Sequence, residues 1–225
     1  MIFNSTRPEV SLPLTIPRTS AFKAKDWRYL GHQRSGDKLL KFDGTDKLIT
    51  SFKDASVEFA RKNTNSIVKY IIDHAPVRNQ HTRILIDVKI HYMEVGGYTC
   101  MKGWHLDGSV NAKSIPKKPE VHHLFIAGIC GHTEFLDTKV DLPIDESLNF
   151  VQISKKVGGA LDNTEGLPVF AVPNSQYVTY GDHDFHRPAK IMQSGYRLMV
   201  RVTETDVLEP RNKIMADGKF LQVIF

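Results

Sequence analysis

The chain has 225 residues, a net charge of +5, and ordinary hydrophobic (41%) and charged (24%) fractions. These values predict one folded globular domain and exclude a disordered chain. No apolar run approaches the roughly 20 residues that cross a bilayer, and the N-terminus lacks the apolar core of a secretory signal. Two cysteines, Cys100 and Cys130, are too few for a disulfide framework, and we expect both to be buried apolar side chains. We therefore expect a cytoplasmic protein without a membrane anchor.

The first part of the chain is predicted to be an irregular arm followed by a helix. Residues 1–45 alternate Pro, Ser, Thr and basic residues with short apolar runs, which is typical of an arm packed over a main body. A helix is expected over 51–73, because Thr50 or Ser51 can cap it and apolar residues then recur at helical spacing. Residues 63–65 mark a point where this helix can split, and Pro76 ends it.

From Arg83 onward the apolar pattern changes to a period of two, which indicates strands. One face of the first strand carries Ile84, Ile86, Val88, Ile90 and Tyr92, and the other carries Arg83, Asp87, Lys89 and His91. Further short strands are expected over 98–104, 122–130, 133–138, 150–153, 168–172, 176–180, 195–204 and 220–225, with a loop over 155–166. Such a series without helices between the later strands predicts a mainly β barrel or sandwich with helical support on one face.

His105 and Asp107 stand two residues apart at the end of an expected strand, so their side chains share one face. His186 follows about eighty residues later and can close a triangle around the point on which they converge. Two imidazoles and one carboxylate on one side of a metal, with the other positions open, are the ligands of non-haem Fe(II) in O2 chemistry. We therefore predict that His105, Asp107 and His186 are metal ligands and catalytic residues.

Two arginines follow the distal histidine on one strand. Arg197 and Arg201 share a face with Met199, and a buried guanidinium needs a carboxylate partner. A bound dicarboxylate can supply one through a bidentate contact. Of the remaining histidines, His91 and His132 are expected to face solvent, and at most one of the adjacent pair at 122 and 123 to face the interior.

Residues 83–205 resemble the Fe(II)/2-oxoglutarate-dependent dioxygenases, of the prolyl-hydroxylase-like or nucleobase-oxidising type. The matching pieces are His105-x-Asp107, Gly131-x-Thr133-x-Phe135, His186 and Gly195-x-Arg197. This resemblance implies a double-stranded β-helix (jelly-roll, cupin-like) core over 81–206. The whole chain, 1–225, would then be a single dioxygenase domain, with an N-terminal arm and supporting helix (1–80) and a C-terminal extension (207–225).

The resemblance also implies the roles of the site residues. The three ligands would hold Fe(II), and Arg197, eleven residues past His186, would bind the far carboxylate of the co-substrate 2-oxoglutarate. Arg201 is a second candidate for that carboxylate or for an acidic group of the substrate. Tyr92 and Tyr98 compete for a further co-substrate contact. His183 is the alternative distal ligand, but it would lie fourteen residues before Arg197, longer than usual for the family.

The reaction implied is hydroxylation of a substrate by O2, coupled to decarboxylation of 2-oxoglutarate to succinate. The primary substrate is open: a nucleobase of a nucleic acid or nucleotide, a protein side chain or a small metabolite. Lysines at 113, 117, 118, 155 and 156 would suit an anionic substrate, and Trp104 or Tyr180 could stack on a base. The alternatives are a jelly-roll binding or structural module without redox chemistry, and a cupin-type metal enzyme that does not use 2-oxoglutarate.

Overall fold

The structure is a computed structural model that describes residues 21–23, 51–107, 120–128, 132–138, 141–143, 148, 150–182 and 184–215. The elements in chain order are β1 (Ala21–Lys23), β2 (Phe52–Ser56), α1 (Val57–Lys62), α2 (Ser66–Asp73), β3 (Arg83–Met93), β4 (Val121–Gly128), β5 (Thr133–Leu136), β6 (Asp141–Pro143), α3 (Phe150–Asp162), β7 (Val169–Ala171), β8 (Tyr177–Gly181), β9 (His186–Pro188), β10 (Gly195–Thr205) and β11 (Lys213–Ile214). The prediction of a mainly β protein with supporting helices is confirmed.

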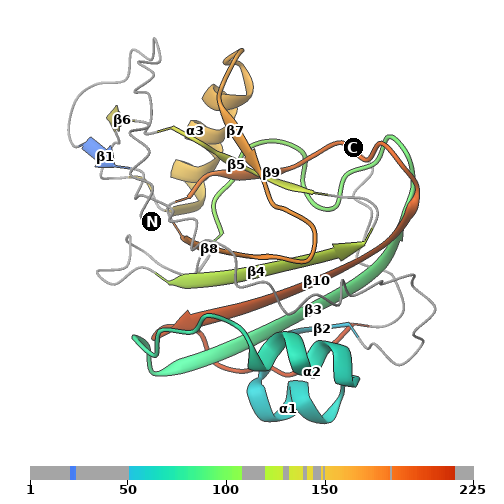
Figure 1. The fold of residues 1–225 in the computed structure, drawn as a ribbon. Helices are drawn as coiled ribbons and strands as arrows, with labels where there is room; N and C mark the ends of the chain where they lie inside the picture. Colours follow the sequence, from blue (N-terminus) through green and yellow to red (C-terminus); the bar gives the residue numbers. More distant parts are fainter. Residues whose placement is uncertain are drawn as a thin grey trace, which may run out of the picture.

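The strands pair antiparallel in every sheet (Figure 1). The largest sheet has the order β11-β2-β3-β10-β4-β8, a smaller one has the order β7-β5-β9, and β1 pairs with β6. The two long strands β3 and β10 pair along their whole length, so that Asp87 lies opposite Arg201, Lys89 opposite Met199 and His91 opposite Arg197. Because alternate side chains point to opposite faces, this register puts all six side chains on one face of the large sheet.

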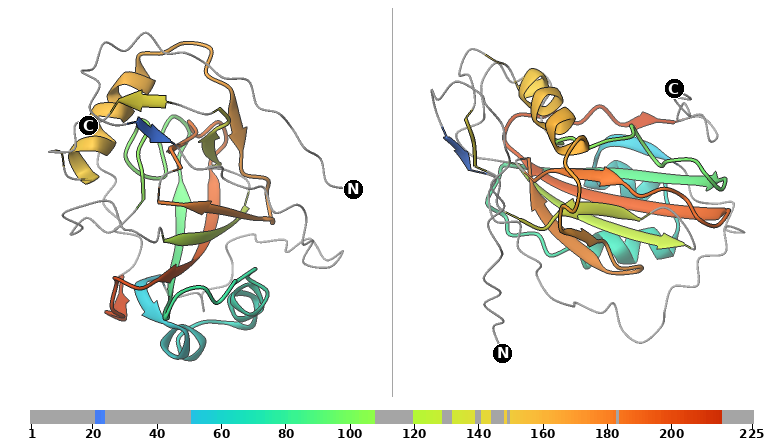
Figure 2. Two further views of the ribbon diagram at one scale, coloured as in Figure 1. Left: turned by 90° about the vertical axis from the view of Figure 1, so that its left-hand side faces the viewer. Right: turned by 90° about the horizontal axis from the view of Figure 1, so that it is seen from above.

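The sheets and helices form layers, with α1 and α2 on one side of the large sheet and the smaller sheet and α3 on the other, as Figure 2 shows from two further directions. The apolar face of β3 packs against α1 and α2, where Val68, Ile71 and Ile72 are buried. Between the two sheets lies a second cluster of Leu124, Ile126, Phe135, Val172, Val178 and Tyr180. The period-two pattern of β3 is therefore confirmed, with its apolar face on the helices and its polar face toward the smaller sheet.

The prediction of a helix over 51–73 is wrong for residues 52–56, and its expected break at 63–65 is confirmed. Residues Phe52–Ser56 form strand β2, and helices α1 and α2 follow, separated near Asn65, whose side chain caps α2 by accepting a hydrogen bond from the Val68 N–H at 3.0 Å. Asp54 has a positive φ of 50° at an irregularity in the pairing of β2 with β3. Its N–H donates to Asp87 Oδ1 at 2.7 Å, a contact with a distant strand that local periodicity does not reveal.

Two other predictions are corrected, and one lies outside the described residues. The predicted strand over 150–153 and most of the predicted loop over 155–166 belong to helix α3, which ends at Asp162. Only the last residues of the predicted loop lie outside the helix. The segment over 98–104 forms bends and contains no strand. The predicted strand over 220–225 lies outside the described residues. Within the part of the chain that the structure describes, no helix is long and apolar enough to cross a membrane.

Candidate metal centre

His105 and His186 face one another across a short antiparallel bridge. The His105 N–H donates to the His186 carbonyl at 2.9 Å, and the His186 N–H donates to the His105 carbonyl at 3.0 Å. His186 is the first residue of β9, and Asp107 follows His105 by two residues on the same face. Backbone pairing therefore fixes the separation of the two histidines, and strand alternation adds the carboxylate.

Helix α3 supports the segment that carries His105 and Asp107 from behind. Trp104 and Leu106, which alternate with the two ligands, are buried against α3. The Trp104 N–H donates to Asp162 Oδ1 at 3.1 Å and the Leu106 N–H to Ser154 Oγ at 3.0 Å, so helix side chains replace a neighbouring strand. Gly158 permits this approach, because a Cβ there would lie 2.1 Å from the Trp104 carbonyl oxygen.

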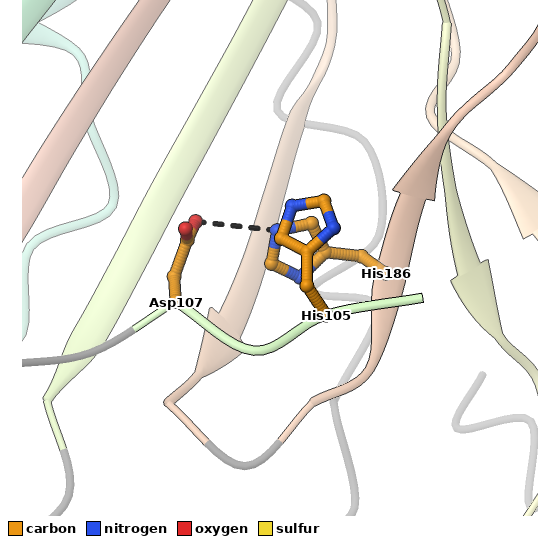
Figure 3. A group of neighbouring side chains, drawn as sticks. All are labelled: His105, Asp107 and His186. Carbon is orange, nitrogen blue, oxygen red and sulfur yellow. Dashed lines mark ion pairs between the residues drawn. The ribbon is translucent and has the colours of Figure 1, made fainter. Parts of the chain in front are cut away.

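The three predicted ligands converge on one point. One nitrogen or oxygen atom from each of His105, Asp107 and His186 lies within 4.8 Å of the others. The two imidazole rings have centroids 4.5 Å apart, and His186 Nε2 is 3.3 Å from Asp107 Oδ2 (Figure 3). A cation between these groups would stabilise the cluster, since each offers a lone pair toward the same space.

Both histidines are held in the same tautomer. Nδ1 of His105 lies 2.9 Å from the Gly103 carbonyl oxygen, and Nδ1 of His186 lies 3.0 Å from the Asp184 carbonyl oxygen. A carbonyl only accepts, so each Nδ1 carries a proton and each Nε2 is the ring nitrogen left to bind a metal. Orientation of a ligating imidazole by a hydrogen bond at its other nitrogen is the usual arrangement in metal sites. No sequence pattern indicated these two carbonyl partners.

The carboxylate of Asp107 is ionised and bound by two donors. Tyr180 Oη and Arg201 Nη1 both donate to Oδ2, each at 2.6 Å. Burial by itself would raise the pKa of this carboxyl, but the guanidinium of Arg201 and the imidazole of His186 outweigh it and hold the pKa well below the usual range. Arg201 also donates to Asp87 Oδ2, from Nη2 at 2.5 Å and from Nε at 3.1 Å. The carboxylate partners of Arg201 are thus Asp87 and Asp107. From the sequence, a bound dicarboxylate was considered as the partner.

A pocket of about 190 Å³ lies in front of the three ligands. Its wall includes Arg197, whose side chain is buried, and Lys89. Lys89 Nζ donates to the Thr99 carbonyl at 2.9 Å. Burial, together with the charge of Arg197, lowers the pKa of Lys89 to about 8. The predicted anchor Arg197 therefore shares one pocket with the metal ligands and has a second cation nearby.

Two further histidines beside the centre are buried and neutral. Burial, with the charges of Lys89 and Arg197, lowers the pKa of His91 to about 3, and neither ring nitrogen has a hydrogen-bond partner among the described residues. His91 was expected to face solvent, which is wrong, because it lies opposite Arg197 on the polar face of β3. Burial and Arg201 likewise lower the pKa of His122 to about 3, and its Nδ1 lies 2.9 Å from Thr203 Oγ1.

His123 belongs to a different buried cluster. Its Nδ1 is 2.8 Å from Thr179 Oγ1 and its Nε2 is 2.9 Å from Glu204 Oε1. The same carboxylate accepts from the backbone N–H groups of Arg78, at 2.8 Å, and Gln80, at 3.1 Å. His122 and His123 are both buried but lie on opposite faces of β4: His122 faces Tyr180 between the two sheets, whereas His123 faces Glu204 on the other side of the large sheet, so one of the two faces the space between the sheets, as expected.

Cys100 lies at the mouth of the metal centre. It is exposed, contrary to expectation, and lines the pocket with Sγ 4.0 Å from His105 Nε2. Burial alone would lower the pKa of His105, but Cys100, Asp107 and the Gly103 carbonyl together outweigh it and raise the pKa to about 9. His105 is therefore protonated at neutral pH until a metal displaces the proton.

The remaining predicted site residues are not beside the ligands. Tyr92 is 54% exposed and packs edge-on against Tyr196, on the face opposite Lys89, and neither Tyr92 nor Tyr98 lines the pocket. Trp104 is buried under α3 and Tyr180 between the sheets, so neither is free to stack on a base. His183, Cys130, Gly131 and the lysines at 113, 117 and 118 lie outside the described residues, and Lys155 and Lys156 are exposed on α3.

The functional residues that sequence reasoning missed are Tyr180, as a donor to Asp107, and Asp87 and Lys89. A signal existed for the last two, because both stand on the polar face of the first strand, which was recognised. With the site described, the comparisons with known proteins add nothing: no family model matches the sequence, no curated protein matches it, and no solved structure matches the fold.

Proposed function

We propose that this chain is an Fe(II)- and 2-oxoglutarate-dependent dioxygenase that hydroxylates its substrate. The observation that carries the proposal is the convergence of His105, Asp107 and His186 within 4.8 Å on the wall of a pocket that also contains Arg197. The donor set fits Fe(II), because two neutral imidazole nitrogens and one carboxylate are the facial ligands of non-haem iron oxygenases. The remaining positions of the metal would face the pocket.

The order of the strands supports a double-stranded β-helix as the core. In chain order the eight segments are β3, the His105 segment, β4, β5, β7, β8, β9 and β10. The first, eighth, third and sixth are neighbours in the large sheet, and the fifth, fourth, seventh and second are neighbours in the smaller one when the bridge of His105 to His186 is counted. Two interlocked Greek keys of this kind make a jelly roll.

The charges of the pocket fit a dianionic co-substrate. Lys53, Lys89, Arg197 and Arg201 line it, against the two carboxylates Asp87 and Asp107. Both carboxylates are hydrogen-bonded to Arg201, and the lining holds more lysine and arginine side chains than carboxylates. A dicarboxylate with one end at the metal and the other at Arg197 would bring the matching negative charge.

The protein's own residues would orient the reactants and keep water out. The Nε2 atoms of His105 and His186 and the ionised Asp107 would hold the metal, and Arg197 would hold the far carboxylate of the co-substrate. Phe135 packs against both His186 and Tyr180, with ring centroids 5.3 and 4.8 Å apart, and closes the floor of the site. Bound Fe(II), 2-oxoglutarate and O2 would supply the oxidising power, with succinate and CO2 as products.

Anaerobic titration tests the proposal directly. Purified protein is titrated with Fe(II) and then with 2-oxoglutarate, while the weak visible charge-transfer band of the chelated keto acid is followed. We expect the band to form and to be lost in His105→Ala and in Arg197→Ala. Iron binding without a 2-oxoglutarate band would favour the cupin-type metal enzyme. No metal binding at all would favour a binding or structural module.

A further inference from the structure

Strand β2 contains a bulge beside the polar face of β3. The register of the two strands shifts between Phe52 and Ala55, so that two residues of β2 stand opposite one of β3, Asp87. One of the two is Asp54, whose positive φ of 50° is uncommon for a residue with a side chain. Bulges redirect backbone groups and are frequent beside functional sites. This bulge turns the Asp54 N–H toward Asp87 Oδ1, at 2.7 Å.

The bulge is held by the segment that follows β10. The Asp54 carbonyl accepts from the backbone N–H groups of Arg211, at 2.8 Å, and Asn212, at 3.1 Å. The Asp54 carboxylate accepts from Arg211 Nε at 2.8 Å and from Nη2 of the same guanidinium. Asn212 Oδ1 accepts from the Ser56 N–H at 2.9 Å, at the end of β2. A costly backbone conformation is thus maintained by residues 157 positions further along the chain.

Asp87 connects the bulge to the metal ligand Asp107. Its Oδ1 is bound by the Asp54 N–H, and its Oδ2 accepts from Arg201 Nη2 at 2.5 Å and Nε at 3.1 Å. The guanidinium is planar with donors in fixed directions, so these two bonds set the direction of the third donor. That donor is Nη1, which meets Asp107 Oδ2 at 2.6 Å. Hydrogen bonds therefore run from Arg211, through Asp54, to a predicted metal ligand.

A second ion pair of the same segment provides a contrast. Glu209 pairs with Arg83 at 2.5 Å and has a largely exposed side chain. Arg83 also donates to the Asp206 carbonyl at 2.9 Å. Among the described residues, these contacts lead to no metal ligand. Two charged residues two positions apart thus differ in whether their contacts continue toward the metal centre.

We propose that Asp54 and Asp87 are positioning residues for the metal ligand Asp107. Arg211 holds the bulge, and the bulge sets, through Asp87, the direction in which Arg201 meets that ligand. The inference rests on the metal site of the proposed function. A ligand that is already oriented by hydrogen bonds loses less side-chain freedom when a metal binds, so its affinity for the metal is higher. Loss of one link should leave the three ligands in place and weaken metal binding.

The test is a titration with Co(II), followed by its visible spectrum. Asp87→Asn keeps an acceptor for the Asp54 N–H but can replace the oxygen that accepts from Arg201 by an amide donor, and we expect a loss of Co(II) affinity of about 10–100-fold. Arg211→Gln should lose about two- to tenfold, and Arg211→Lys less, because it keeps a charge beside Asp54. Glu209→Gln is the matched control, since it removes one charge from the same segment, and should stay within about twofold.

Denaturant unfolding of the metal-free variants separates positioning from stability. A merely structural role would lower the free energy of unfolding in Arg211→Gln and leave the Co(II) affinity of the folded protein unchanged. That result, wild-type affinity in folded Asp87→Asn, or an equal loss in Glu209→Gln would overturn the inference and leave the proposed function standing. The Arg211 side chain is 66% exposed, so Arg211→Gln carries the test even if Asp87→Asn does not fold. Failure of the wild-type chain to bind Co(II) or Fe(II) would overturn both.

Discussion

Two histidine–carboxylate pairs, His123 with Glu204 in the large sheet and His186 with Asp107 at the smaller sheet, differ in how fully their nitrogen and oxygen atoms are hydrogen-bonded. In the first, His123 has a partner at each ring nitrogen, and Glu204 accepts from His123 and from two backbone N–H groups. In the second, His186 Nε2 is 3.3 Å from Asp107 Oδ2, and a ligand atom of a second histidine, His105, lies within 4.8 Å of both residues. The first pair is closed, whereas the second has donor atoms to spare.

The difference shows how a structural pair is told from a ligand set. Burial does not separate them, because His123 and His186 are both buried. The direction of the hydrogen bonds does separate them. His105 and His186 each bond a backbone carbonyl through Nδ1, which leaves Nε2 facing the candidate metal centre. Four measurements would test this difference between the two pairs.

His105→Ala removes one of the three predicted metal ligands. We expect Fe(II) or Co(II) affinity to fall by more than about 100-fold, since loss of a direct ligand exceeds the 10–100-fold typical of its hydrogen-bond partners. The free energy of unfolding of the metal-free protein should change by less than about 1 kcal/mol, because the side chain is only half-buried. Metal titration and denaturant unfolding measure the two effects. Equal metal binding by the variant would contradict the assignment.

Arg197→Ala tests whether the pocket beside the predicted metal ligands binds the co-substrate. We expect 2-oxoglutarate affinity to fall about 100-fold, because a buried charge-assisted contact is lost, while metal affinity is kept. Isothermal titration of the metal-loaded protein measures both. Arg83→Ala, a change of a more exposed arginine on β3, is the control and should alter neither. A variant that unfolds and keeps no metal would make Arg197 structural.

His123→Ala removes the histidine that bonds Glu204. We expect it to lower the free energy of unfolding and to leave metal affinity unchanged. Glu204 would lose its imidazole partner in a fully buried site, so we expect the free energy of unfolding to fall by about 2–4 kcal/mol. Metal affinity of the folded protein should stay within about twofold. Thermal or urea unfolding and Co(II) titration provide the readouts, and His132→Ala, at an exposed histidine, is the control. Loss of metal binding in folded His123→Ala would remove the distinction between the two pairs.

Metal affinity should depend on pH through His105. Its pKa is raised to about 9, so the free protein carries an extra proton at neutral pH that the metal must displace. We expect Co(II) affinity to rise about tenfold per pH unit between about pH 6 and 8 and to level off toward the pKa. In Cys100→Ser the plateau should begin at lower pH, because Cys100 helps to raise that pKa. A flat profile in the wild-type chain would show that His105 is already neutral.

Local patterns were sufficient where a residue's environment follows from its own strand. The alternation in β3 correctly separated Ile86 and Val88 from Asp87 and Lys89, and the two-residue spacing placed His105 and Asp107 on one face. The pairing of these residues with His186 required knowledge of which strands are neighbours. The sequence reached it only through the resemblance to a family.

Local patterns failed where a distant segment decides the conformation. A loop was predicted over 155–166, but Gly158 lies within α3, at a point where the backbone of Trp104 passes too close for a side chain. Asp54 adopts a positive φ within β2 while its N–H bonds to Asp87, where periodicity favoured a helix. Tyr180 was interpreted as a surface for a base, because a strand pattern does not reveal that its hydroxyl ends at a carboxylate.

The contact at Gly158 makes the position of His105 depend on the position of helix α3. The helix touches the chain at Trp104, directly before His105, and its Ser154 and Asp162 bind the amides on either side of that ligand. A methyl group at Gly158 would push on the Trp104 carbonyl and tilt the His105 imidazole without adding an atom to the pocket. Gly158 is thus a buried position outside the pocket at which a substitution would change the affinity for a metal bound by His105.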